Sequence, residues 1–175
     1  FDAQVADRDA LLAITLDTGA TVEATVADMA GVIGEKIELG RVTTVRAPAT
    51  TYLHRRASDL PPQVGVLVAY DGDEETAKGI AMQIAAMRPS FLNRDDVPAE
   101  TVENERRIAE TAAKEEGKPE QAIPKIVEGR VNAFFKDNVL LEQASVVENK
   151  KTVADVLAEN GTTVRAFARF EPGQA

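Results

Sequence analysis

The stretch from Asp95 to Lys136 decides the fold of the middle of the chain, and it reads DDVPAETVENERRIAETAAKEEGKPEQAIPKIVEGRVNAFFK. It predicts two helices joined by a tight turn at Gly117, Lys118 and Pro119. Asp95 or Asp96 can accept hydrogen bonds from the free amides of a first helical turn, and Pro98 suits that turn because its missing N–H is not needed there. Gly117 is placed to end the first helix, since glycine adopts positive φ at little cost.

The two predicted helices differ in how much apolar surface they offer. The second has an apolar face made of Ala122, Ile123, Ile126, Val127, Val131 and Phe134. The first offers only Val102, Ile108, Ala109 and Ala112 among many charged residues. This is too little for a buried bundle but enough for a thin antiparallel coiled coil that projects into solvent. Two amphipathic helices lying on a core are the alternative.

Outward from the hairpin, the hydrophobic spacing predicts a mixture of helices and strands. The helices expected before the hairpin are 7–15, a second that opens at Gly19 or Thr21 and ends at Gly34, and 74–87. The strands expected there are 37–45, 50–56 and 63–70, the last being nearly all apolar and therefore central. After the hairpin we expect short strands at 139–141 and 145–147, a helix at 152–160 and a strand at 163–170.

The fold class that follows is α+β. The two ends of the chain repeat one order, in which a Thr-Val pair precedes a helix, a glycine and an apolar strand that contains arginine. We therefore expect two small related subdomains with antiparallel sheets and flanking helices, the helical hairpin being inserted in the second. The predicted division is residues 1–73 for the first subdomain, 74–97 with 138–175 for the second, and 98–137 for the hairpin.

Composition excludes several classes of protein. The chain has 175 residues, 44% of them hydrophobic, and a net charge of −9, which argues against nucleic acid as a direct ligand. No apolar run approaches the ~20 residues of a membrane span. The absence of cysteine excludes disulfides and thiolate metal sites and suits a reducing cytoplasm. Phe1 is not a natural start, so we expect a fragment or a processed product.

The sequence shows no pattern typical of a catalytic, cofactor or metal site. His54 is the only histidine, and Arg55 and Arg56 beside it disfavour a catalytic role. The acidic group from Asp71 to Glu75 lacks the spacing of a calcium loop and is better explained as a helix cap. We therefore predict no enzyme activity, no cofactor and no metal.

A chain without such groups is expected to act by contacting another macromolecule. The candidate contact residues are Val64 at the start of the central strand, Met82 and Gln83 on the helix 74–87, and the adjacent Val146 and Val147. The positions of Ile80 and Ile84 place Gln83 off the core face of that helix, and one of Val146 and Val147 should be exposed. Methionine is common on binding surfaces because it repacks easily. Ordinary core packing is the alternative for each of the apolar residues.

The segment 95–143 resembles the coiled-coil region of the bacterial elongation factor Ts family. The resemblance rests on Gly117-Lys118-Pro119, on IVEGR at 126–130 and on FFKD at 134–137, and it extends through VENKKTV at 147–153 and RFE at 169–171. Pro124 departs from many members of the family, so the second helix should start later or bend there.

The resemblance implies a guanine nucleotide exchange factor whose partner is the GTPase elongation factor Tu. It implies that Val64, Met82 and Gln83 meet the G domain of the GTPase and that Val146 and Val147 meet its distal β domain. In the family, a Thr-Asp-Phe motif that follows a small helical domain loosens the Mg²⁺ and phosphate site. Phe1-Asp2 is not that motif in context, so we expect binding of the GTPase with poor release of GDP. A structural or assembly module is the alternative, with the hairpin driving homodimerisation or docking to another complex.

Overall fold

The computed structural model describes residues 5, 7–55 and 57–173. Phe1 and Asp2, and Arg56 at the end of a predicted strand, lie outside the described residues. The chain forms two compact units, one of residues 1–46 with 173–175 and the other of residues 47–172.

The first unit contains two helices whose ends follow their capping residues. Helix α1 (Arg8–Leu12) starts after Asp7, whose side chain accepts a hydrogen bond from the Ala10 amide at 2.8 Å. Helix α2 (Val22–Ile33) starts after Thr21, which accepts from the Ala24 amide. Gly34 ends α2 in the left-handed conformation at φ 78°. Of the two predicted starts, Gly19 and Thr21, the helix opens at Thr21, and the predicted end at Gly34 is confirmed.

The strand predicted at residues 37–45 is wrong. This segment has no regular secondary structure, and all of its side chains are exposed or half-buried. Alternation of apolar and polar residues stabilises a strand only where a neighbouring strand supplies hydrogen bonds and a core covers the apolar face. Neither condition holds here among the described residues of the unit.

The second unit is built on a three-stranded antiparallel sheet. Its strands are β1 (Ala49–His54), β2 (Val64–Asp71) and β3 (Thr163–Phe170), in the order β1-β2-β3. Val66 pairs with Tyr52 on one side and with Arg169 on the other, which fixes the register. The prediction that the apolar run at 63–70 forms the central strand is confirmed.

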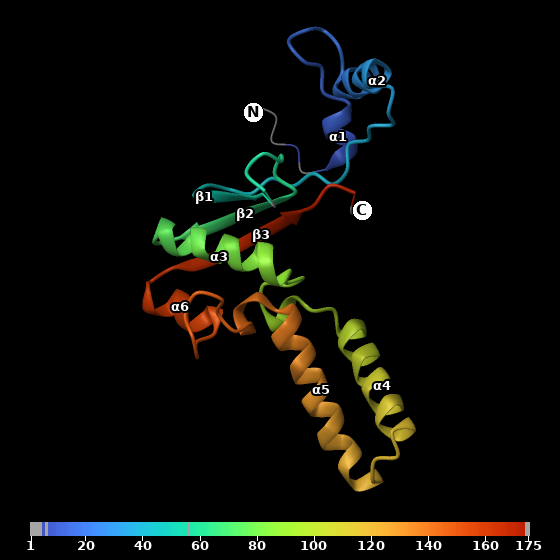
Figure 1. Ribbon diagram of the computed structural model, residues 1–175, viewed down its shortest axis with the longest axis vertical. Coiled ribbons are helices and arrows are strands. Elements are labelled where there is room, and N and C mark those ends of the chain that lie inside the picture. The colour runs from blue at the N-terminus through green and yellow to red at the C-terminus, as the bar shows by residue number, and fades with distance from the viewer. Residues whose placement is uncertain (1–4, 6, 56, 174–175) are drawn as a thin grey trace. The chain divides into compact units, whose positions relative to one another are not determined.

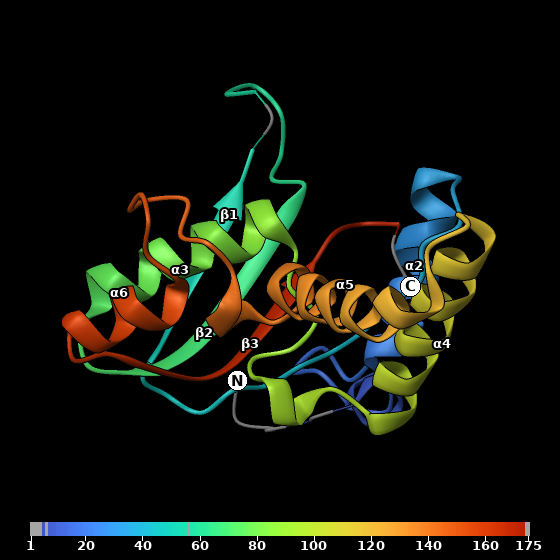
Figure 2. The ribbon, with the colours of Figure 1, turned by 90° about the horizontal axis from the view of Figure 1, so that it is seen from below.

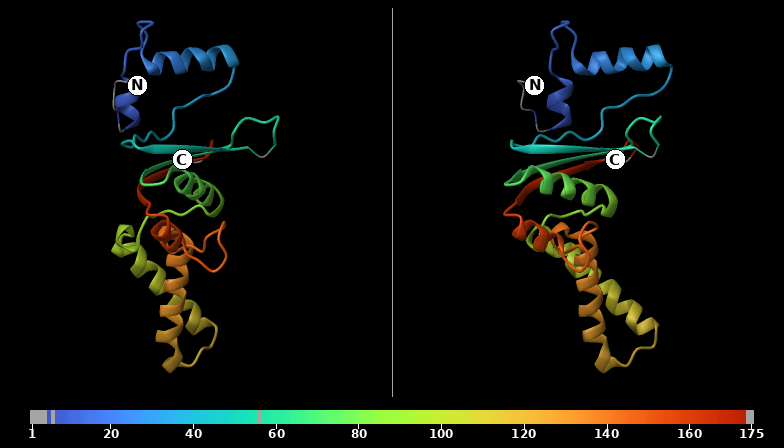
Figure 3. Two further views of the ribbon diagram at one scale, coloured as in Figure 1. Left: turned by 90° about the vertical axis from the view of Figure 1, so that its left-hand side faces the viewer. Right: turned by 60° about the vertical axis from the view of Figure 1, so that its left-hand side comes forward.

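Helix α3 (Glu74–Met87) lies across one face of this sheet, with the bounds that the sequence predicted (Figure 3). Asp73 caps it by accepting from the Thr76 amide at 2.7 Å. Helix α6 (Val153–Glu159), which Thr152 caps at its start, packs into the same core. The core that these elements bury consists of Val64, Val66, Val68, Ile80, Ala81, Ile84, Leu140, Val153, Leu157 and Val164.

A helical hairpin extends from this core, as Figure 1 shows. It consists of α4 (Ala99–Glu115) and α5 (Ile123–Asn138), with short 3₁₀ turns η1 (Arg94–Asp96) before it and η2 (Glu120–Ala122) between the helices. Gly117 has φ 70° at the end of α4, and Pro124 sits in the first turn of α5, so the later start predicted for this helix is confirmed. Its own core contains Val97, Ala109, Ala113, Ile123, Val127, Val131, Phe135 and Val139.

Three details of the hairpin differ from the prediction. Ile108 is 53% exposed, because the seam of α4 follows Ala109 and Ala113 instead. On α5 the buried ring is that of Phe135, and Phe134 is only partly buried. Asp95 and Asp96 do not cap α4: they belong to η1, where the Asp96 side chain accepts from the Asn93 amide at 3.0 Å, and Pro98 occupies the N-cap of α4.

The segment after the hairpin also differs from the prediction, which placed strands at 139–141 and 145–147. It contains the 3₁₀ turn η3 (Leu140–Glu142) and single bridges that join Val139 to Phe91 and Ala144 to Thr152. Short apolar runs do not distinguish strands from buried turns, and here Val139 and Leu140 are fully buried without a ladder.

Helices together with one antiparallel sheet among the described residues confirm the α+β class. The strands of the sheet come from residues 49–71 and from residues 163–170, which the sequence assigned to different subdomains. The predicted division into two related subdomains and an inserted hairpin stays a prediction.

Candidate protein-docking surface

Helix α3 and the loop of residues 144–151 lie side by side and carry the predicted contact residues. In Figure 2 this loop runs beside α3 before it enters α6. The loop is held by the bridge between Ala144 and Thr152 and by the Ser145 hydroxyl, which accepts from the amides of Val147 and Glu148 at 3.2 and 3.0 Å. We call residues Val146 and Val147 the loop tip.

An apolar groove lies between the edge strand β1, α3 and the loop tip. It has a volume of about 310 Å³ and is lined by Tyr52, His54, Met82, Ala85, Ala86 and Val146. We call it the Met82 groove. It brings Met82 together with Val146, although the resemblance assigned them to separate contact regions. Tyr52 and His54 point to this groove because alternate residues of a strand share a face, and Ala85 and Ala86 follow Met82 by one helical turn.

A second groove lies on the other flank of the loop tip. It is lined by Ile80, Gln83, Val147 and Val156 among its less polar residues and by the carboxylates of Asp73, Glu75 and Glu148. We call it the Val147 groove. The loop tip therefore separates two hollows, and Val146 faces one of them while Val147 faces the other.

Exposure separates the predicted contact residues into two groups. Met82, Val146 and Val147 are 43%, 51% and 67% exposed, whereas Val64 is 8% and Gln83 only 1% exposed. The expectation that one of Val146 and Val147 is exposed holds for both. The expectation that Gln83 points away from the core is wrong, because the loop 144–151 covers this side of α3 and buries the amide.

The Gln83 side chain bonds directly to the loop. Its Nε2 donates to the Ala144 carbonyl at 3.1 Å and to Gln143 Oε1 at 3.2 Å, and its Oε1 accepts from the Val146 amide at 2.8 Å. Gln143 is equally buried and donates to the Asp137 carbonyl at the end of α5 at 2.8 Å. Gln143 was not predicted to have a role, because a lone glutamine after an apolar run does not indicate a buried, hydrogen-bonded amide.

The charged side chains near this surface form ion pairs or hydrogen bonds with one another or with the backbone. Hydrogen bonds to Glu75 and then Glu74 raise the pKa of Lys78 to about 12. Lys151 likewise bonds to Glu148 and Glu159, and these bonds raise its pKa. The hydrogen bond from the Thr76 amide lowers the pKa of Asp73. The exposed apolar side chains therefore stand among charges that already have partners.

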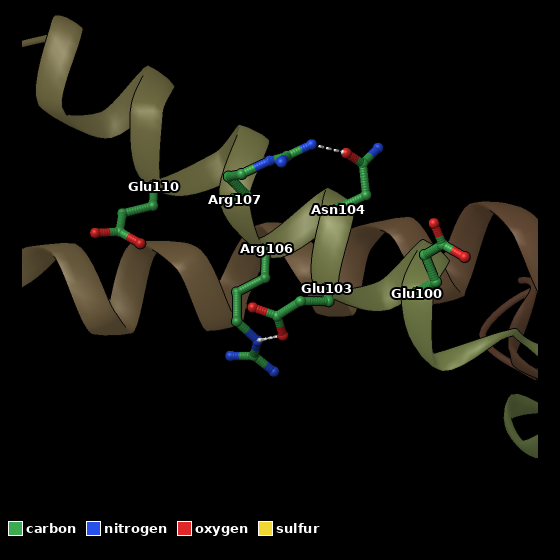
Figure 4. A pocket seen from close by; sticks show the side chains of 6 residues that line it. All are labelled: Glu100, Glu103, Asn104, Arg106, Arg107 and Glu110. Atoms are coloured by element: carbon green, nitrogen blue, oxygen red, sulfur yellow. Dashed lines mark hydrogen bonds and ion pairs between the residues drawn. The ribbon is translucent and has the colours of Figure 1, made fainter.

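His54 lies in the Met82 groove and not in a catalytic arrangement. Its Nδ1 is 3.2 Å from the Tyr52 hydroxyl, and the remaining described residues of the groove are aliphatic. A hollow along α4 collects more charge, as Figure 4 shows, and two pairs form among its residues within the helix. Arg106 pairs with Glu103 at 3.8 Å and Arg107 donates to Asn104 at 2.6 Å.

The residues that the structure describes contain neither a metal-binding cluster nor a membrane-spanning helix. No cluster of three or more His, Asp or Glu side chains in residues 5, 7–55 and 57–173 could hold a metal ion. In the same part of the chain, every helix is too short or too polar to cross a membrane.

The geometry defines an α+β protein with a helical hairpin and with exposed apolar side chains on α3 and the loop tip. The family model for elongation factor TS matches residues 1–174, and the chain belongs to this family. It is 59% identical to the elongation factor Ts of Nocardia farcinica over 99% of the chain and 64% of the relative. It is 59% identical to that of Saccharopolyspora erythraea and 57% identical to that of Mycobacterium avium, over 97% and 99% of the chain and 62% and 64% of the relatives. The chain thus spans less than two thirds of the length of these relatives.

Proposed function

We propose that this chain binds the GTPase elongation factor Tu in the cytoplasm and takes part in nucleotide exchange during translation elongation. The observation that carries the proposal is the exposure of Met82, Val146 and Val147 on a well-packed core in a member of this family. Three large apolar side chains that stay in water on two adjacent grooves are typical of a protein-binding surface.

The mechanism needs no covalent chemistry from the chain. Nucleotide and exchange factor bind the same GTPase, and each weakens the binding of the other by the same factor, because coupling free energy is reciprocal. A tenfold acceleration of GDP release corresponds to roughly 1.4 kcal/mol of differential binding. Contacts of the GTPase with α3 and the loop tip supply binding free energy. This free energy offsets the cost of distorting the Mg²⁺ and phosphate site of the GTPase.

The contacts follow from the placement of the residues. The resemblance assigns Val64, Met82 and Gln83 to the G domain and Val146 and Val147 to the distal β domain. Because Met82 and Val146 line one groove, we propose that a single continuous surface serves both contacts. Val64 and Gln83 are buried and act indirectly, Val64 through packing in the core and Gln83 through its hydrogen bonds to the loop.

The hairpin of α4 and α5 has the features of an antiparallel coiled coil, which we propose as its structure. On α5 the buried residues Ile123, Val127, Val131 and Phe135 recur every four positions, and the partly buried Ile126 and Phe134 follow Ile123 and Val131 by three. Its charged outer face, shown in Figure 4, suits a second partner more than the exchange reaction.

The Thr-Asp-Phe motif that opens the nucleotide site in the family does not occur in these 175 residues. We therefore propose a division of work in which this chain supplies affinity. Binding of the GTPase should be measurable while GDP release stays slow. Release as fast as that given by a full-length relative would contradict this division.

The test combines binding and release of a fluorescent GDP from elongation factor Tu. Replacing Val147 by Asp places a charge on the most exposed apolar residue of the surface, and we expect affinity to fall at least tenfold. The matched control is Ile108→Asp on α4, which changes a β-branched side chain one methylene larger that is 53% exposed. Equal losses from both variants, or none from Val147→Asp, would contradict the proposed surface.

The same experiment separates the alternative of an assembly module. If the hairpin is the functional surface, Ile108→Asp should abolish association with a partner or a second copy while Val147→Asp leaves it unchanged. Sedimentation of the two variants alone and mixed with elongation factor Tu distinguishes the two functions.

A further inference from the structure

The amide of Gln83 is a buried polar group next to the proposed docking surface. It is 1% exposed, it lies on α3, and it bonds to the loop 60 and more residues further along the chain. Both polar atoms of its side chain form hydrogen bonds: Nε2 donates to the Ala144 carbonyl and to Gln143 Oε1, and Oε1 accepts from the Val146 amide.

These bonds form a chain of amides through the core. Gln143 Nε2 donates to the Asp137 carbonyl in the last turn of α5 and, at 3.4 Å, to the Met87 carbonyl at the end of α3. Its Oε1 accepts from Gln83, whose Oε1 in turn accepts from the amide of the loop tip. Thus the ends of α3 and α5 connect through two buried glutamines to Val146. Buried amides that are fully bonded fix one geometry, because any other leaves polar groups unpaired at high cost.

We propose that Gln83 is a positioning residue, assisted by Gln143, which holds the loop tip in the conformation that contacts the partner. The proposal rests on the proposed function and refines it: Gln83 does not touch the GTPase but sets where Val146 and Val147 stand. The other bonds of the loop are those of the Ser145 hydroxyl, the bond from the Ser145 amide to the Lys151 carbonyl, the bridge of Ala144 with Thr152, and the pairs of Lys151 with Glu148 and Glu159. None of these bonds reaches α3.

The first measurement is hydrogen exchange of the whole chain, which needs no partner. Gln83→Met keeps length and volume but removes the bonds to Ala144 and Val146. We expect exchange in residues 144–148 to rise about tenfold, the equivalent of one lost buried hydrogen bond, while β2 and the hairpin stay protected. Gln83→Asn, which keeps an amide but is too short to reach the loop, should behave in the same way. Unchanged exchange in 144–148 with both variants would overturn the proposal.

The second measurement is a double-mutant cycle of binding to elongation factor Tu. Gln83→Met should lower affinity about five- to tenfold in the wild-type chain. In a chain that carries Val146→Ala and Val147→Ala, which keep the backbone amide but lack the tip side chains, the same change should cost less than about twofold. An equal loss in both backgrounds would show that Gln83 acts directly or through general destabilisation, and would overturn the proposal.

Failure of the proposed function has a different signature. A wild-type chain that does not bind the GTPase removes the proposed function, and hydrogen exchange then decides alone whether Gln83 holds the loop tip. If wild type binds and Gln83→Met loosens 144–148 without loss of affinity, the proposed function stands and the positioning role is overturned.

Circular dichroism and thermal unfolding identify any variant that fails to fold. In that case Gln143→Met tests the same chain of hydrogen bonds from its other end.

Discussion

At the scale of single residues, Gly72 shows how a local signal and a distant contact meet. The sequence Asp71-Gly72-Asp73 predicts the end of a strand and the start of a helix, and Gly72 makes this turn at φ 112°. A Cβ at this position would lie 2.6 Å from the Gly161 carbonyl oxygen and 2.9 Å from the Thr162 Cα. Both neighbours are backbone atoms, so they cannot move aside as a flexible side chain would. The Thr162 hydroxyl also accepts from the Asp73 amide at 3.0 Å.

We therefore expect Gly72→Ala to lower the free energy of unfolding by about 2 kcal/mol or more, through steric overlap and positive φ. The matched control is Gly129→Ala in α5, where a Cβ meets no atom within 4 Å and alanine should stabilise the helix by about 0.5–1 kcal/mol. Denaturant unfolding of the three chains gives both values. Similar stability of the two variants would contradict the close approach at Gly72.

At the scale of elements, Arg94 fixes the base of the hairpin. Its Nε and Nη2 donate to the two carboxylate oxygens of Glu142 at 2.5 and 2.7 Å, and its guanidinium lies 4.2 Å from the centre of the Phe135 ring. One side chain thus joins η1 before the hairpin to α5 and η3 at its end. A bidentate pair of this kind sets orientation as well as adding stability.

This ion pair makes a pH-dependent contribution to stability. Hydrogen bonds from Arg94 lower the pKa of Glu142 below its ordinary value of 4.5. The stabilisation is therefore fully present above that value and is lost as pH falls through the lower pKa of the folded state. Because Arg94 is about half exposed, we expect Glu142→Gln to cost only about 0.5–1 kcal/mol at pH 7.

Denaturant unfolding from pH 7 downwards checks this expectation. The difference between wild type and Glu142→Gln should begin to shrink near pH 4.5 and vanish once the pH is below the lower pKa of Glu142 in the folded state. Glu103→Gln, which removes a carboxylate that is 78% exposed in α4, should change stability by less than about 0.5 kcal/mol at pH 7. A difference that grows at low pH would contradict the direction of the Glu142 shift.

At the scale of the whole molecule, burial is unequal between the two compact units. The buried core residues of the described chain all lie between Thr50 and Val164, within the second unit. None of the described residues 5 and 7–46 is buried, although α2 is largely apolar. Stability that comes from buried apolar surface should therefore be concentrated in the second unit.

Native-state hydrogen exchange of the whole chain tests this distribution. We expect the amides of β2 to exchange only through global unfolding, and those of α2 to exchange through local opening at a much lower free energy. Addition of low denaturant should leave α2 rates nearly constant and accelerate those of β2. Equal protection of α2 and β2 would show that both units unfold together.

The sequence alone determined what depends on neighbours along the chain. The bounds of α3, the caps at Thr21 and Asp73, the turn at Gly117 and the central strand β2 follow from side-chain periodicity and from residues that suit one backbone conformation. The candidate contact residues that are exposed, Met82, Val146 and Val147, were also proposed from the sequence, partly through the resemblance to the family.

Tertiary structure decided whatever depends on residues far apart in the chain. The alternating segment 37–45 forms no strand because no neighbour pairs with it, and Ile108 stays exposed because the facing surface of α5 selects Ala109 and Ala113. Gln83 is buried by a loop 60 residues away, and Met82 meets Val146 in one groove for the same reason. Burial and pairing are properties of two surfaces in contact, and one segment specifies only its own half of each contact.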